Sequence, residues 1–87
     1  MVLRVVDLQR AFDDLLSEAR TREDISDWAR SVRLENDAGR LTFEPAEMRD
    51  RLWRAVLYME GVDLKDGPSS YLHVPDDFRE YRARLGL

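Results

Sequence analysis

Apolar side chains recur every three or four residues in four separate stretches of the chain, and this spacing is what most constrains the fold. In the first stretch, from about Leu3 to Ala19, they are Val5, Leu8, Phe12, Leu15, Leu16 and Ala19. An apolar stripe with charged residues on the opposite face is typical of an amphipathic helix. The residues from Val2 to Val6 would also fit a short strand, but the later period favours a helix.

A second helix is expected after Thr21, whose hydroxyl can cap the first turn, with Asp24 three residues on as in a capping box. Its apolar stripe consists of Ile25, Trp28, Ala29 and Val32. The turn-forming residues Asn36, Asp37 and Gly39 follow. The sequence therefore predicts that this helix ends near Arg33 or Leu34.

The third helix is expected to begin at Pro45, because proline is favoured in a first helical turn. Its apolar residues are Met48, Leu52, Trp53, Ala55, Val56, Leu57, Tyr58 and Met59. A stripe this wide is typical of the most buried helix, although Trp53 stands slightly off its centre and is expected to be partly exposed. Gly61 suits a left-handed residue that ends the helix.

A loop at residues 62–70 leads into a short extended stretch, Tyr71–Val74, and then into a last helix that starts at Pro75. One face of this helix carries Phe78, Tyr81, Arg82 and Leu85, and Gly86 follows as its stop. The pattern predicts an all-α fold: a compact four-helix single domain that covers residues 1–87.

Composition excludes several classes of protein. The chain has no cysteine, so disulfides, thiolate metal sites and thiol catalysis are excluded, and its single histidine leaves no His-rich metal cluster. No apolar run approaches the roughly 18–20 residues that span a bilayer, and Arg4 and Asp7 interrupt the N-terminal apolar stretch. We therefore expect a cytoplasmic protein without a membrane partner, a metal or a cofactor.

The formal net charge of −4 is concentrated in one part of the chain. Residues 60–77 hold five acids, Glu60, Asp63, Asp66, Asp76 and Asp77, against the single base Lys65. We call this stretch the acidic segment. Because nucleic-acid binders usually carry a basic patch, the charge predicts no direct nucleic-acid partner. It favours a basic protein partner instead, with Tyr71 and His73 completing the contact surface, while a merely solvated loop stays open.

Other chemistry is weaker in the sequence. His73 could pair with a nearby aspartate as a general base, which would make the chain an enzyme, but a loop or helix-capping role is the simpler interpretation. Arg49, Arg51 and Arg54 are expected to point in different directions around the third helix. The arginines of the last helix, interleaved with Tyr81, could hold RNA, but the acidic segment would repel it.

Three motifs suggest a family: TREDISDWA at residues 21–29, MEGVDL at 59–64 and SSYLHVPDDFREY at 69–81. Together they resemble small bacterial immunity proteins of colicin-D-like nuclease toxins. The resemblance implies a protein that inhibits a nuclease cutting transfer RNA. Such an inhibitor would cover the active site of the nuclease with acidic groups in the positions of the RNA phosphates. The resemblance places these groups at Glu60, Asp63, Asp66, Asp76 and Asp77.

We therefore expect a non-enzymatic binding protein, an immunity-type inhibitor that covers the basic active site of a toxin. The expected partner-binding residues are Glu60, Asp63, Asp66, Tyr71, His73, Asp76 and Asp77. The alternative is a small interaction or structural subunit of a larger complex, which an exposed apolar patch including Trp53 would favour. The sequence leaves a homodimer open.

Overall fold

Four helices and two small sheets form the computed structural model, which describes residues 1–67, 70–71 and 73–87 and, of Asp66, only the backbone. The helices are α1 (Val5–Ser17), α2 (Arg22–Asp37), α3 (Arg49–Glu60) and α4 (Pro75–Leu85). The strands are β1 (Val2–Arg4), β2 (Thr42–Glu44), β3 (Lys65–Gly67) and β4 (Ser70–Tyr71), and a 3₁₀ turn, η1 (Ala46–Met48), precedes α3. The prediction of a compact four-helix fold is confirmed.

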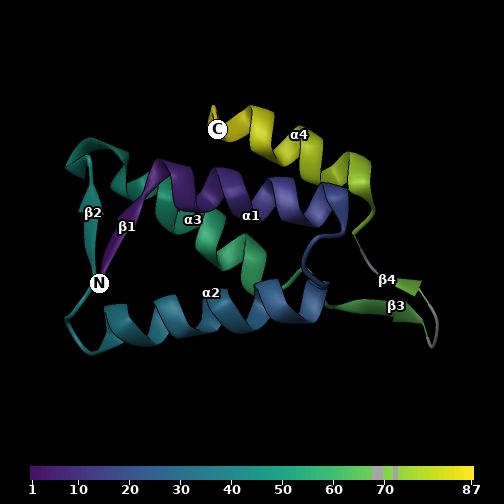
Figure 1. Cartoon of the computed structure of the whole chain (residues 1–87), viewed down its shortest axis with the longest axis horizontal. Coiled ribbons are helices and arrows are strands. Elements are labelled where there is room, and N and C mark those ends of the chain that lie inside the picture. The colour runs from purple at the N-terminus through teal and green to yellow at the C-terminus, as the bar shows by residue number, and fades with distance from the viewer. Residues whose placement is uncertain (68–69, 72) are drawn as a thin grey trace.

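The core lies where the apolar stripes of the four helices meet. In Figure 1, α1 crosses the middle of the molecule with α4 along one side, while α2 and α3 pack against each other. Its largest fully buried side chains include Phe12, Phe78, Leu8, Ile25 and Leu52. The predicted stripes thus supply the core.

The ambiguous N-terminus forms first a short strand, which the prediction of a helix from about Leu3 had set aside, and then the predicted helix. β1 pairs in parallel with β2, with Leu3 opposite Phe43, and α1 begins at Val5. The backbone N–H of Arg4 donates to the Asp7 carboxylate at 2.8 Å, which caps the first turn of α1. The sequence missed this sheet because a three-residue strand has too short a pattern to recognise.

The helix boundaries agree with the prediction at some ends and not at others. Thr21 caps α2 by accepting from the backbone N–H of Asp24 at 3.0 Å, and Gly86 ends α4 with a left-handed φ of 73°, both as predicted. However, α2 continues to Asp37, and α3 begins at Arg49 rather than at Pro45. The 3₁₀ turn occupies the residues between Pro45 and α3.

Gly61 also differs from the prediction, because it ends α3 with a φ of −102° and not in the left-handed region. Across the described ranges, no helix is both long enough and apolar enough to cross a bilayer.

Candidate nucleic-acid interface

The acidic segment is bound largely to the rest of the chain. Glu60, at the end of α3, accepts from Nε of Arg33 on α2 at 2.9 Å through both carboxylate oxygens. Nε of Arg30 lies 4.0 Å from Oε1 of the same carboxylate. Only 22% of the Glu60 side chain is exposed. Glu60 therefore joins α2 to α3 and presents little of its charge to a partner.

The other acids of this segment lie in separate surroundings. Asp76 pairs with Arg79 at 2.9 Å, and Asp77 accepts from the backbone N–H of Val74 at 3.0 Å, which caps α4. Asp63 is half-buried and forms no ion pair with the described residues. The predicted contact through the Asp66 side chain lies outside the described residues.

Tyr71, also expected at the partner surface, instead bridges to α2. Its hydroxyl donates to Glu23 at 2.8 Å. This hydrogen bond lowers the pKa of the Glu23 carboxyl and raises the pKa of the Tyr71 hydroxyl, because it favours the ionised acid beside the neutral phenol. The Arg22 guanidinium lies 4.2 Å from the Tyr71 ring. Tyr71 thus ties the β3–β4 hairpin to the start of α2.

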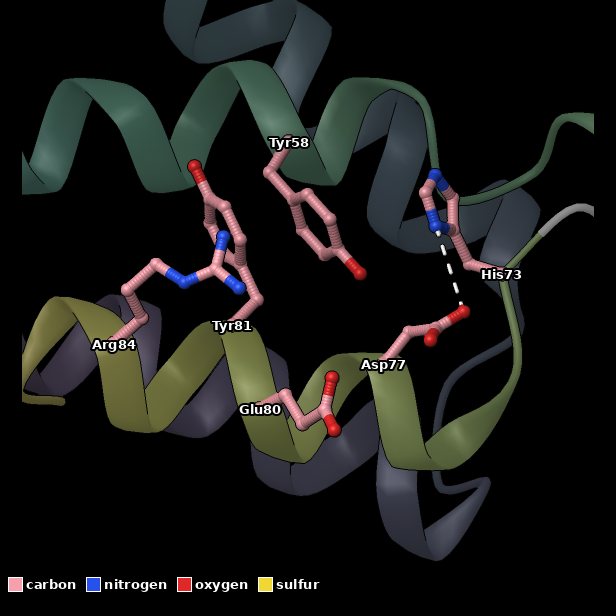
Figure 2. A pocket seen from close by; sticks show the side chains of 6 residues that line it. All are labelled: Tyr58, His73, Asp77, Glu80, Tyr81 and Arg84. Carbon is pink, nitrogen blue, oxygen red and sulfur yellow. Dashed lines mark ion pairs between the residues drawn. The ribbon is translucent and has the colours of Figure 1, made fainter.

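His73 and Asp77 are the two predicted residues that the fold brings together. Figure 2 shows them at one end of an open hollow of about 240 Å³, with Tyr58, Glu80, Tyr81 and Arg84 along its walls. The Nδ1 atom of His73 lies 3.8 Å from Oδ2 of Asp77, and the backbone carbonyl of His73 accepts from Arg22. His73 thus lies two residues before α4, and the side chain that caps this helix is that of Asp77.

Tyr58 forms the floor of this hollow. Its ring stacks on Tyr81 with centroids 4.0 Å apart and meets Phe78 edge-on at 6.4 Å. The Tyr58 hydroxyl is buried and has no hydrogen-bond partner among the described residues. Burial raises the pKa of Tyr58 to about 12, since the phenolate would lose its hydration.

The surroundings of His73 also bear on the alternative of an enzyme. Asp77, its carboxylate neighbour, also serves as the cap of α4. Within the described part of the chain, no three histidine, aspartate or glutamate side chains gather closely enough to hold a metal ion. The arrangement places His73 beside Asp77 in an open hollow that Tyr58, Glu80, Tyr81 and Arg84 also line.

The arginines fall into two groups. Seven form ion pairs with carboxylates: Arg4, Arg20, Arg30, Arg33, Arg40, Arg79 and Arg82. The other six form no such pair with any described residue: Arg10, Arg22, Arg49, Arg51, Arg54 and Arg84. Arg22 is half-buried and donates to the backbone carbonyl of His73, whereas the other five are exposed. These guanidinium groups are available to an external anion.

Three of these arginines lie where α3 and α4 meet. Arg51 and Arg54 are three residues apart and so share a face of α3. The Tyr81 hydroxyl donates to the backbone carbonyl of Arg54 at 3.3 Å, and a Cβ atom added to Gly86 would lie 3.5 Å from an Arg51 guanidinium nitrogen. Arg84, on α4, lies beside Tyr81 (Figure 2). We call Arg51, Arg54 and Arg84 the arginine edge.

The expectation that Arg49, Arg51 and Arg54 diverge is therefore right only for Arg49. Its guanidinium lies over Phe43, 5.8 Å from the ring centroid, on the flank of α3 that faces β2. Sequence reasoning missed the arginine edge because it treated α3 and α4 separately. The sequence carried no signal for it, because Glu47 and Asp50 lie four residues before Arg51 and Arg54, the spacing at which helical ion pairs form.

Comparison with known proteins identifies a relative and a family. The chain is 34% identical over 67 residues to the uncharacterized protein YxzC of Bacillus subtilis (strain 168), which covers 77% of this chain and 49% of that protein. The chain thus spans about half the length of this relative. No solved structure matches it.

These matches show that the resemblance to colicin-D-like immunity proteins is wrong, and with it the predicted role as a toxin inhibitor and the basic protein partner. The prediction of no direct nucleic-acid partner is also overturned, because the matching family carries a DNA-binding description. The error came from net charge, which counts paired and unpaired groups alike. A family model described as YxzC DNA-binding protein matches residues 4–84, so the chain belongs to this family.

Proposed function

We propose that this chain binds DNA and that the arginine edge contacts the phosphate backbone. The observation that carries the proposal is the gathering of Arg51, Arg54 and Arg84 at one edge, without carboxylate partners among the described residues. Guanidinium groups bind phosphate oxygens through paired N–H donors. The description of the family supports DNA as the source of those phosphates.

The net charge of −4 limits the strength of this binding without preventing it. Charges farther apart than a Debye length, about 8 Å at physiological salt, are largely screened. A phosphate at the arginine edge therefore responds mainly to nearby groups. These include the acids Glu80, in the adjoining hollow, and Glu47 and Asp50, which precede Arg51 and Arg54 by four residues. We expect weak binding at low salt that falls steeply as salt is added.

The proposal makes the chain a non-enzymatic binding module that acts in the cytoplasm. Its support is the character of the candidate surface, which offers fixed positive charge rather than a nucleophile or a base aimed into a closed pocket. The acids and His73 of the other surface serve the fold in this proposal, as caps and as bridges between elements.

Fluorescence anisotropy with a labelled DNA duplex, measured over a series of salt concentrations, tests the proposal. The double variant Arg51→Ala/Arg54→Ala should lower the affinity at least tenfold at low salt. It should also reduce the slope of log K against log salt by about 2, since each phosphate contact contributes about 0.9.

The matched control is Arg40→Ala/Arg79→Ala, which removes the same charge from two exposed arginines that pair with Glu35 and Asp76. This control should leave the salt slope unchanged. An equal loss of affinity in both double variants would show that net charge alone governs binding, and absence of binding by the unmodified chain at low salt would refute the proposal.

A further inference from the structure

The flank of α3 that faces β2 carries a second recessed surface. Two hollows of about 370 and 220 Å³ adjoin there, and Asn36, Phe43 and Arg49 line both. Asp50 and Trp53 complete the second hollow. We call these five residues the Phe43 groove. It lies between the end of α2, the strand β2 and the first turns of α3.

Aromatic faces and a cation dominate this groove. Phe43 and Trp53 meet edge to face with centroids 6.4 Å apart, and both rings are only partly buried. The Arg49 guanidinium lies over the Phe43 ring and pairs with no carboxylate in the described ranges. Half-exposed aromatic rings beside an unpaired guanidinium are the groups on which nucleic-acid bases stack and to which their phosphates bind.

Hydrogen-bonding groups lie within the same groove. The Asn36 side-chain amide makes no hydrogen bond to the described residues, so it has both donors and an acceptor to offer. Asp50, also on the wall, is exposed and can only accept. An amide beside a carboxylate matches the mixed donor and acceptor edge of a base better than it matches a wholly apolar ligand.

We propose that the Phe43 groove binds an unpaired base of single-stranded DNA, stacked on Phe43 or Trp53, with Asn36 at the base edge and Arg49 at the adjacent phosphate. The inference rests on the proposed function and extends it, because it assigns a base contact to a surface separate from the arginine edge. Both surfaces start from α3, so one strand can reach both. A duplex keeps its bases stacked inside and would contact only the arginine edge.

The test uses the emission of Trp53 in a Trp28→Phe variant, in which Trp53 is the only tryptophan. Titration with a single-stranded DNA dodecamer should quench this emission, and the duplex of the same sequence should not. Asn36→Ala should weaken single-strand binding by roughly fivefold, as expected for one or two lost hydrogen bonds. Trp53→Leu should weaken it by roughly tenfold or more, since stacking of a base is lost.

Leu34→Ala is the control, because Leu34 is exposed on α2 and lies outside the groove. It should change neither the affinity for single-stranded DNA nor the affinity for the duplex. If Trp28→Phe does not fold, the indole N–H resonance of Trp53 in the unmodified chain reports the same contact. Unchanged Trp53 signals at saturating single strand, with duplex binding intact, would overturn this inference alone. Failure to bind either form of DNA would overturn both it and the proposed function.

Discussion

The acidic segment and the arginine edge carry opposite charge, and they differ more in how that charge is used than in its sign. Glu60 ends α3 and holds two arginines of α2, whereas Arg51 and Arg54 on the same helix hold no carboxylate of the described chain. Both regions lie where two helices meet, α2 with α3 and α3 with α4, but only at the first junction are opposite charges paired. Availability for a partner therefore follows from packing and not from net charge.

This difference has a structural cause. α2 packs along α3, so Arg30 and Arg33 reach the end of α3 where Glu60 lies. Opposite charges at such a junction pair with each other, and water and salt screen the remaining electrostatic field that a partner would meet. Arg51 and Arg54 lie where α3 meets α4, but no carboxylate of the described residues comes within ion-pair distance of them. Three changes test this contrast.

The largest effect is expected from Phe78→Ala, which removes the anchor beneath the acidic segment. Phe78 is 1% exposed, meets Tyr58 edge-on and lies 4.9 Å from the Arg22 guanidinium. Loss of a buried phenylalanine costs about 3–5 kcal/mol of unfolding free energy. Urea unfolding followed by circular dichroism measures it. Val74→Ala, at an exposed neighbouring position, should cost less than about 0.5 kcal/mol.

If Phe78→Ala and Val74→Ala destabilise equally, the segment is not anchored through the core. The contrast between an embedded acidic segment and an outward arginine edge would then lose its basis.

A smaller effect is expected from Glu60→Gln, which keeps the size of the side chain and removes its charge. We expect a loss of about 1 kcal/mol, since a hydrogen bond between charged groups is replaced by a neutral one at a partly buried site. Asp76→Asn is the matched control, because its side chain is 85% exposed and its pair with Arg79 should contribute little. Chemical unfolding of both variants decides whether burial or charge sets the cost.

An equal and negligible change in the two variants would mean that Glu60 is as free as Asp76. The acidic segment would then be a surface in the same sense as the arginine edge.

The smallest effect at neutral pH is expected from Tyr58→Phe, at the boundary between the two regions. The Tyr58 hydroxyl is buried without a partner among the described residues, so its removal should leave stability unchanged or raise it by about 0.5 kcal/mol. At high pH the variants should diverge. Burial raises the pKa of Tyr58 in the folded chain to about 12, above its ordinary value of 10.

Because the unfolded chain loses this proton first, unmodified protein should lose stability as the pH rises from about 10 to 12, and Tyr58→Phe should lose less. Unfolding measured at pH 8 and again above pH 10 separates the two effects. Parallel decline of both proteins above pH 10 would contradict a buried hydroxyl, and a loss above about 1 kcal/mol at pH 8 would reveal an unseen partner.

Sequence reasoning succeeded where local forces decide the structure. The apolar stripes placed four helices, Thr21 caps α2, and Gly86 ends α4 in the left-handed region. It failed where the partner is distant. β1 forms because it pairs with β2, with Leu3 opposite Phe43. Pro45 lies outside α3 because it directly follows this paired strand in an extended conformation. A short strand has no signal of its own, since its partner supplies its hydrogen bonds.

The candidate surfaces follow the same division. The sequence identified His73, Asp77, Trp53 and the arginines of α3 and α4 as unusual, and it located the acids of the segment. It could not say that Glu60 is held by Arg33, 27 residues earlier in the chain. Nor could it say that Tyr81 reaches Arg54 across the gap between two helices.

The sequence by itself determined the helices, their buried faces and the total charge, because each depends on residues within a few positions of one another. The tertiary structure alone decided which charges cancel and which stay available, because an ion pair between α2 and α3 requires the two helices to pack first. For a chain with more acids than bases, this choice of partners determines where an anion such as DNA can bind.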